Sequence, residues 1–181
     1  MAGVPGSFGG ALAMNAGAFG GETWPLVESV DCVDRNGKCS TIPAREIQFS
    51  YRHVALPQGN YLLSGVVQLE TAVDDLDGKD KIKALLEKRS SSQPIQSANA
   101  GSVFKNPKGD YAARIIEAIG LKGYAIGDAC FSDVHSNFII NRGNCCAHDI
   151  ESLILLAQKR ALEKLDVILE PEVRVIGRSL R

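Results

Sequence analysis

Polar side chains that could do chemistry crowd into the segment GSVFKNPKG, residues 101–109. It places a hydroxyl at Ser102, an amine at Lys105 and an amide at Asn106, between glycines and a proline. In an extended segment side chains alternate between two sides, so we expect Ser102 and Asn106 on one side and Lys105 on the other. The alternative is a strand end followed by turn residues.

Two further stretches offer charged groups. In FSYRH, residues 49–53, the forked guanidinium of Arg52 follows an aromatic residue and could hold a carboxylate or a phosphate. In EPEVR, residues 170–174, Glu172 lies on a β-prone segment, where a partly buried acid needs a partner or a raised pKa. A solvated arginine and a surface ion pair are the respective alternatives.

The chain opens with MAGVPGSFGGALAMNAGAFGGE, in which seven glycines fall between Gly3 and Gly21. Ordering glycine costs more backbone entropy than ordering any other residue. Such a run is therefore either disordered or lets the backbone come very close to something. Successive small residues expose N–H groups that can surround an anion, so a phosphate or pyrophosphate site is one interpretation and a tightly packed turn region is the other. The chain has neither a Rossmann G-x-G-x-x-G nor a Walker A motif.

Composition excludes several function classes. A net charge of −1 and a pI near 6.3 give no electrostatic footprint for nucleic acid or for an anionic membrane surface. No apolar run is long enough to span a bilayer, and no signal peptide is evident. The five cysteines show no C-x-x-C spacing, which predicts neither a zinc site nor a disulfide framework and fits a reducing cytoplasm.

The rest of the sequence predicts ordinary elements. Asn36-Gly37 between β-prone runs indicates a hairpin in which both turn residues take a positive φ, and the Leu- and Val-rich run 61–73 indicates a buried strand. NFIIN, residues 137–141, indicates a short strand. Helices are predicted over 74–89, 110–120 and 146–166. The apolar positions of these helices are Ile82, Leu85 and Leu86, then Ala112, Ile115, Ile116 and Ile119, then Ile150, Leu153, Ile154, Ala157 and Ala161.

In their amino-acid sequences and in their order along the chain, these stretches resemble one family. GVPGSFGGALAMNAGAFGGE, FSYR, AGSVFKNP, LKG, HSNFIIN and LEPEVRVIG are similar to segments of the UDP-N-acetylenolpyruvoylglucosamine reductases, flavoenzymes of peptidoglycan precursor synthesis. The resemblance covers essentially the whole chain, and GSVFKNP and EPEVRVIG are its most specific parts. It implies a cytoplasmic, FAD-dependent oxidoreductase in which NADPH reduces FAD. Hydride then passes to the enolpyruvyl ether of a UDP-sugar, giving UDP-N-acetylmuramate.

The resemblance also implies an α+β fold and a set of site residues. A partial FAD-binding (PCMH-type) domain is expected over residues 1–95, and a compact αβ substrate-binding domain over residues 96–181, with the boundary in the polar loop before the second domain. Ser102 would be the proton donor, and Glu172 and Arg52 would hold the developing enolate. Lys105 and Asn106 would lie near the substrate. The FAD pyrophosphate would lie against Gly6, Gly9, Gly10, Asn15 and Ala16, and no metal is implied.

One departure from the family pattern matters. The family normally begins with another subdomain, carrying a G-G-G-S-N type segment, and Met1 stands where the family sequence is already under way. We therefore expect a truncated reductase that holds FAD weakly, is inactive alone, and either self-associates or needs a complementing N-terminal segment. The alternatives are a related flavin oxidoreductase with another substrate and a non-enzymatic UDP-sugar-binding module.

Overall fold

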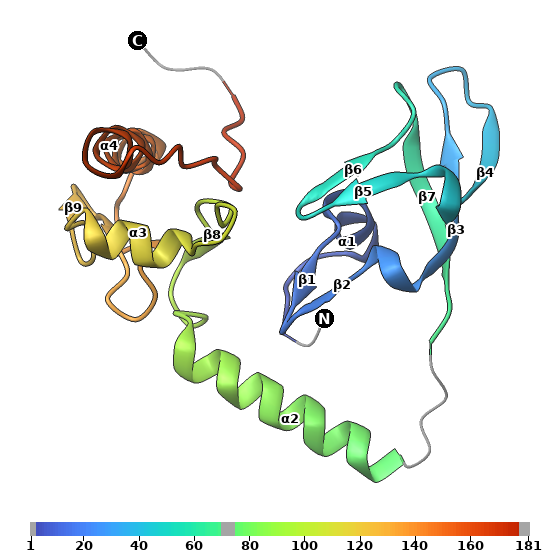
Figure 1. Ribbon diagram of the computed structural model, residues 1–181, viewed down its shortest axis with the longest axis horizontal. Coiled ribbons are helices and arrows are strands. Elements are labelled where there is room, and N and C mark those ends of the chain that lie inside the picture. The colour runs from blue at the N-terminus through green and yellow to red at the C-terminus, as the bar shows by residue number, and fades with distance from the viewer. Residues whose placement is uncertain (1–2, 70–74, 178–181) are drawn as a thin grey trace. The chain divides into compact units, whose positions relative to one another are not determined.

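The computed structural model of the chain describes residues 3–69 and 75–177 (Figure 1). The chain divides into two compact units after Glu87, inside the long helix α2, Asp75–Ser92. Each unit has its own hydrophobic core. Helix α2 confirms the helix predicted over 74–89, but Ile82 and Leu86 are exposed and do not face a core.

The first unit is built on an antiparallel sheet with the strand order β4-β3-β7 (Figure 1). Its strands are β3, Val27–Val33, β4, Cys39–Pro43, and β7, Tyr61–Val67. Helix α1, Phe8–Met14, packs against β7, where Phe8 and Leu12 come so close that a Cβ on Gly65 would lie 3.0 Å from Leu12 Cδ1. The core of this unit consists of Leu12, Trp24, Val27, Val30, Cys32 and Ile47.

Two small hairpins and two short 3-10 helices complete the first unit. Strands β1, Gly17–Ala18, and β2, Gly21–Glu22, form one hairpin, and β5, Gln48–Ser50, and β6, His53–Ala55, form the other. The 3-10 helices are η1, Trp24–Leu26, and η2, Ala44–Glu46. The β5–β6 hairpin carries Arg52, whereas the glycine-rich segment runs through α1 into the β1–β2 hairpin.

The hairpin predicted at Asn36-Gly37 is confirmed, but its turn is longer than expected. Only Gly37 takes a positive φ, 81°, whereas a two-residue turn would need one at Asn36 as well. The carboxylate of Asp34 accepts hydrogen bonds from the main-chain nitrogens of Asn36, at 2.8 Å, and of Lys38, at 2.9 Å. This side chain stabilises the wider loop 34–38, a use of Asp that dipeptide patterns do not reveal.

The prediction of a buried strand over 61–73 is wrong about its burial. Strand β7 ends at Val67 and exposes Tyr61, Leu63 and Val66 by more than half. Residues 70–73 of that prediction lie outside the described residues. Within the described sheet β7 pairs with β3 alone and is an edge strand. An apolar run has the same composition in a central strand and at an edge, so burial could not be inferred from it.

The second unit packs two helices against a four-stranded antiparallel sheet with the order β8-β11-β10-β9. The strands are β8, Asn99–Ser102, β9, Ala125–Ile126, β10, Ala129–Phe131, and β11, Phe138–Asn141, and the strand predicted over 137–141 is confirmed. Helix α3, Ala112–Ala118, and helix α4, Ala147–Leu165, cover the core.

Both helices of the second unit follow the sequence prediction. Ala112, Ile115, Ile116 and Ile119 are fully buried, and Gly120 ends the helix with φ 74°. Helix α4 begins after the N-cap Cys146 and ends at the C-cap Asp166, and it buries the stripe Leu153, Ile154, Ala157 and Ala161. Apolar spacing thus identified the faces that form this core.

Gly17 is required for the β1–β2 hairpin. A Cβ at this position would lie 2.1 Å from the main-chain oxygen of Gly21, which cannot move without breaking the hairpin. We expect Gly17→Ala to lower the free energy of unfolding of the first unit by about 1–3 kcal/mol. Urea unfolding followed by the fluorescence of Trp24, the one tryptophan of the chain, measures the change.

Gly78→Ala is the matched control for Gly17→Ala. Gly78 lies in α2, where an added Cβ would meet nothing within 4 Å and φ is not positive, so alanine there is expected to leave the first unit's stability unchanged or raise it. Equal unfolding curves for Gly17→Ala and the wild type would contradict the assigned close contact.

Candidate active site

The predicted site residues fall into two clusters, one in each unit. Arg52 and the glycine-rich segment belong to the first unit, and Ser102, Lys105, Asn106 and Glu172 belong to the second. Each cluster therefore has its own scaffold.

The second cluster is built on a ribbon of two paired segments. After β8 ends at Ser102, residues 103–105 run antiparallel to residues 170–172. The nitrogen of Glu172 donates to the oxygen of Val103 at 2.8 Å, and the nitrogen of Lys105 donates to the oxygen of Glu170 at 2.9 Å. The ribbon therefore brings Glu172 beside the residue that follows Ser102.

Pro171 fits this ribbon because of its register. Pro171 stands opposite Phe104, and the two ladder bonds come from the residues that flank it. In an antiparallel pair the residues between two such bonds do not exchange hydrogen bonds themselves. Pro171, which has no N–H, therefore leaves no ladder bond unmade.

Lys105 extends the pairing to its side chain. Its ammonium group lies 2.5 Å from the Oε1 of Glu170, sixty-five positions away in the sequence. The side chain of Lys105 is mostly buried, while that of Glu170 is mostly exposed. The lysine is thus held along the ribbon with its charge at the surface.

Asn106 has its amide oriented by the start of helix α3. Its Oδ1 accepts from the nitrogen of Ala112 at 3.0 Å, while Tyr111 at the N-cap position gives no side-chain cap. Because this bond fixes which end of the amide is the acceptor, the Nδ2 points away from the helix terminus. Asn106 is exposed, and among the described residues its Nδ2 has no acceptor. Two donors are therefore available to a ligand.

In the first cluster, Asn15 is a structural residue. It is fully buried with a left-handed φ of 44°. Its Nδ2 donates to Glu22 Oε2 at 2.9 Å and to the oxygen of Ser50 at 3.1 Å, and its Oδ1 accepts from the nitrogen of Trp24 at 3.1 Å. The side chain thus makes its hydrogen bonds inside the first unit. The main chain of Asn15 is bonded there as well, to Ala11, Leu12 and Arg52.

Ala16, like Asn15, makes hydrogen bonds within the first unit. Its nitrogen donates to the oxygen of Ala11 at 2.9 Å, and its oxygen accepts from the hydroxyl of Thr23 at 2.7 Å. Asn15 and Ala16 together hold the end of α1 against the residues after β2. This leaves Gly6, Gly9 and Gly10 as the open part of the predicted cofactor wall.

These three glycines are exposed and have open space where a Cβ would point. At Gly6, which has φ 136°, an added Cβ meets nothing within 4 Å. At Gly9 and Gly10 it would meet only the hydroxyl of Ser7, at 3.8 and 3.6 Å. Ser7 is the N-cap of α1 and accepts from the nitrogen of Gly10 at 3.1 Å. The backbone here is therefore accessible to close approach by a phosphate group.

Arg52 lies in the turn of the β5–β6 hairpin and binds the glycine-rich segment. It takes a left-handed φ of 54°, which is uncommon for a residue with a side chain. Its guanidinium donates to the oxygen of Gly17 at 3.1 Å and to that of Asn15 at 3.5 Å, and lies 4.9 Å from the centre of the Tyr51 ring. Asn15 donates back to Ser50 on the same hairpin, so the two segments hold each other.

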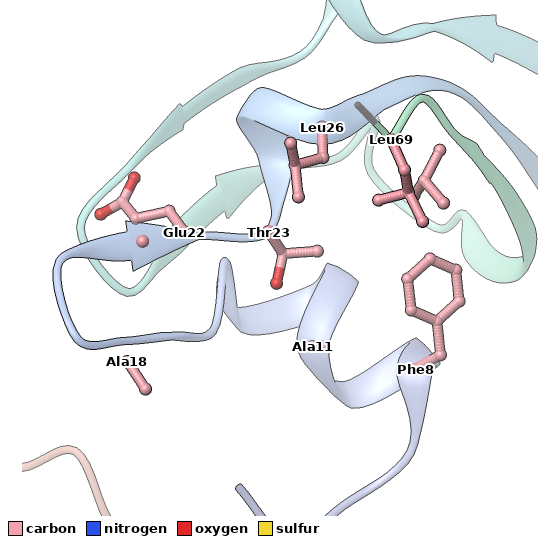
Figure 2. A pocket seen from close by; sticks show the side chains of 9 residues that line it. Phe8, Ala11, Ala18, Glu22, Thr23, Leu26 and Leu69 are labelled. Carbon is pink, nitrogen blue, oxygen red and sulfur yellow. The ribbon is translucent and has the colours of Figure 1, made fainter. Parts of the chain in front are cut away.

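An apolar pocket of about 270 Å³ lies in the first unit (Figure 2). In Figure 2 the side chains of Phe8, Leu26 and Leu69 lie close together around it, and Thr23 lies between them and Glu22, whose carboxylate points away. Sequence reasoning did not identify this pocket, because its walls come from α1, the β1–β2 hairpin and the end of β7. The full lining is Phe8, Ala11, Ala18, Gly21, Glu22, Thr23, Leu26, Val67 and Leu69.

Three negative findings apply to the part of the chain that the structure describes. No group of three His, Cys, Asp or Glu side chains is placed to hold a metal ion there. In the same residues, no helix combines the length and the apolar character needed to cross a bilayer. All five cysteines are free thiols.

Sequence reasoning missed two buried or half-buried amides that support the ribbon. Asn137 bonds the main chain of Phe104, and the Nε2 of Gln158 in α4 donates to the oxygen of Leu169 at 3.0 Å. The only available signal was a polar residue next to an apolar strand or inside a helical stripe, which is too common to be specific.

Fold and site define the class first: a mixed α/β protein in which a glycine-rich unit is followed by a compact unit that presents Ser, Lys, Asn and Glu around one ribbon. Comparison with known proteins then shows what the chain is similar to. The family described as UDP-N-acetylenolpyruvoylglucosamine reductase, C-terminal domain, matches residues 93–176. Sequence similarity to reductases of this name extends well beyond that segment.

The chain is 48% identical to the UDP-N-acetylenolpyruvoylglucosamine reductase of Methylococcus capsulatus, over 99% of this chain and 59% of that protein. It is 47% identical to the same reductase of Alkalilimnicola ehrlichii, over 99% of this chain and 60% of that protein. The crystal structure of UDP-N-acetylenolpyruvylglucosamine reductase from Thermus caldophilus superposes with a TM-score of 0.80 at 33% identity, covering 94% of this chain and 61% of that one. The chain thus spans about three fifths of the length of these relatives.

The side chain of Asn15 provides a direct test of the first cluster. Asn15→Asp replaces a donor to Glu22 by a second carboxylate in a fully buried position. We expect the free energy of unfolding of the first unit to fall by about 3 kcal/mol or more, because a buried charge would be left without a partner. Urea unfolding followed by Trp24 fluorescence measures this loss. Asn60→Asp is the control, because Asn60 is half-buried and its amide donates only to the oxygen of Pro57, at 3.3 Å.

The turn between Asn106 and α3 should be sensitive to acid. Hydrogen bonds from Arg114 and from the nitrogen of Tyr111 lower the pKa of Asp110 to about 2 from its usual value of 3.8. A lowered folded-state pKa stabilises the fold above the unfolded value, and this stabilisation is lost as the pH falls from about 4 towards 2. In an NMR titration of the carboxyl carbon, Arg114→Ala should raise the midpoint of Asp110 towards 3.8. An unchanged midpoint would refute the role of Arg114.

Proposed function

We propose that this chain forms part of a UDP-N-acetylenolpyruvoylglucosamine reductase, which uses NADPH to reduce UDP-N-acetylglucosamine enolpyruvate to UDP-N-acetylmuramate for peptidoglycan synthesis. The observation that carries the proposal is the ribbon of residues 103–105 and 170–172, which places Glu172 beside the segment of Ser102 and Asn106. Relatives that are 45–48% identical over nearly the whole chain carry this name. The free thiols accord with a reducing cytoplasm as its location.

The two units would divide the work. The first unit would be part of a PCMH-type FAD-binding domain, and the second would be the UDP-sugar-binding domain. The family match begins at residue 93, close to the boundary of 95/96 predicted from the polar loop. Both the domain assignment and that boundary are part of this proposal.

The first unit suits a flavin cofactor. Gly6, Gly9 and Gly10 are exposed, have open space where a side chain would point, and would lie against the FAD pyrophosphate. Asn15, Ala16 and Arg52 would keep this segment in shape from behind, through their hydrogen bonds to main-chain and side-chain groups of the same unit. Bound FAD, reduced by NADPH, would supply the hydride for C3 of the enolpyruvyl group.

The second unit would supply the proton. Hydride addition at C3 leaves an electron pair at C2, delocalised into the neighbouring carboxylate. The Oγ–H bond of Ser102 would break as a C–H bond forms at C2, and the serine would regain its proton from solvent. Glu172, which the ribbon holds beside this segment, would lie next to the developing enolate before the proton arrives.

Lys105 and Asn106 would bind the substrate's diphosphate. The Nδ2 of Asn106 offers donors in a fixed direction, since Oδ1 is held by Ala112. Lys105 would turn its ammonium group from Glu170 to a phosphate oxygen, which carries more charge than a single carboxylate. Lys105 and Asn106 would therefore hold the nucleotide end of the substrate, while Ser102, a few residues earlier, would face the reacting end.

Purification of the chain tests this assignment against its alternatives. FAD is added and the unbound flavin is removed by gel filtration. Flavin absorbance that stays with the protein, together with saturable binding of UDP-N-acetylglucosamine enolpyruvate, supports the reductase. A colourless protein that still binds this UDP-sugar supports a binding module instead. A protein that binds neither compound would overturn the proposal.

Ser102→Ala tests the mechanism in a preparation that turns over. The reduction of flavin by NADPH should proceed as before, while consumption of the enol ether should fall by about 100-fold or more, the usual contribution of a positioned general acid. Stopped-flow spectroscopy separates the two half-reactions. Ser91→Ala is the control, because Ser91 lies at the surface of α2 and bonds only the oxygen of Lys88. Turnover of Ser102→Ala at the wild-type rate would disprove the proton-donor role.

A further inference from the structure

Asn137 is a buried amide that grips the main chain of a single residue. Its side chain accepts from the nitrogen of Phe104 at 3.0 Å and donates to the oxygen of Phe104 at 2.8 Å. Its own main-chain oxygen accepts from the nitrogen of Val103 at 2.8 Å. Only 3% of Asn137 is exposed, so these bonds are shielded from competing water.

These hydrogen bonds to Phe104 lie where the regular pairing of β8 with β11 ends. Strand β8 pairs with β11 as far as Ser102 opposite Phe138. Val103 and Phe104 then continue into the protein interior, where both are almost fully buried. Main-chain groups left unpaired at such positions would lose their hydrogen bonds to water without replacement, which is costly. The Asn137 amide uses one donor and its acceptor to replace the peptide group of a neighbouring strand.

This replacement fixes the path of the chain between the predicted functional groups. Ser102 precedes the gripped residues, and Lys105 and Asn106 follow them. On the opposite side of the same segment, Val103 and Lys105 bond residues 172 and 170. Residues 103–105 are therefore held from both sides, by Asn137 and by the segment that carries Glu172.

We propose that Asn137 is a positioning residue, which sets Asn106 and Ser102 in register with Glu172 for the enolpyruvyl UDP-sugar. The proposal rests on the function proposed above. Asp at this position lacks the donor to Phe104, Leu lacks both groups, and Gln carries an extra methylene. Only Asn matches the main-chain pair of Phe104 at this distance.

Hydrogen exchange tests the grip without reference to any ligand. In Asn137→Leu the amide of Phe104 should exchange about tenfold faster or more, while that of Leu153 in the core of the same unit stays protected. Ser136→Ala is the matched control, because Ser136 is an equally buried neighbour whose hydroxyl bonds Glu117 at 2.6 Å, not residues 103–104. Unchanged protection of Phe104 in Asn137→Leu would overturn the proposal.

A double-mutant cycle tests the role in binding. The affinity for UDP-N-acetylglucosamine enolpyruvate is measured by calorimetry for Asn137→Leu, Asn106→Ala and the double variant, at a temperature where circular dichroism shows each to be folded. We expect Asn137→Leu to weaken binding about tenfold alone and less than about threefold in the Asn106→Ala background, because it acts through that residue. Equal losses in both backgrounds would indicate a general loss of stability and overturn the proposal.

Two further provisions keep the outcomes distinct. If Asn137→Leu does not fold, Asn137→Ser is measured in its place, since the smaller polar side chain leaves less mismatch in the buried site. Absence of binding by the wild-type chain would overturn the proposed function, whereas wild-type binding without coupling to Asn106 would overturn only the positioning role.

Discussion

Two main-chain hydrogen bonds between residues 103–105 and 170–172 are the constraint on which the second unit's candidate site depends. Without them the hydroxyl, amine and amide of the GSVFKNP segment and the carboxyl of Glu172 would have no fixed relation, because they lie far apart in the sequence. The register is compatible with Pro171, since the proline faces Phe104 at a position that needs no ladder bond. Asn137, directly before β11, bonds Phe104 of the ribbon, and Gln158 of α4 bonds Leu169, the residue before its other segment. The core of the unit thereby determines the geometry of its surface groups.

In the first unit, the glycine-rich segment must be ordered while part of its main chain stays exposed. A glycine-rich segment has a high entropy of unfolding, and its main chain must stay accessible if it is to meet a phosphate. The structure anchors its end and leaves its beginning open. Asn15 and Arg52 exchange bonds between this segment and the β5–β6 hairpin, whereas Gly6, Gly9 and Gly10 remain exposed. The side chain of Asn15 makes its hydrogen bonds within the unit, and its contact with a cofactor stays a prediction.

Sequence patterns were informative where a local rule determines the outcome. The apolar stripes of α3 and α4 follow from spacing, because one face of a helix must meet the core. The hairpin at Gly37 was found for the same kind of reason. Patterns failed where the neighbour decides: β7 was expected to be buried but is an edge strand, and Ile82 and Leu86 of α2 are exposed. The sequence of one segment does not reveal which other segment will pack against it.

By itself the sequence predicted the helices of the second unit and, through its motifs, a family resemblance that the comparisons confirm and that implied an α+β fold. Only the tertiary structure decided that Lys105 pairs with Glu170, that Asn106 accepts from the first residue of α3, and that Asn137 bonds the main chain of Phe104. The physical reason is the range of the interactions. Apolar spacing and capping act within a few residues, whereas the ribbon and its supporting amides join segments whose meeting depends on the packing of the whole unit.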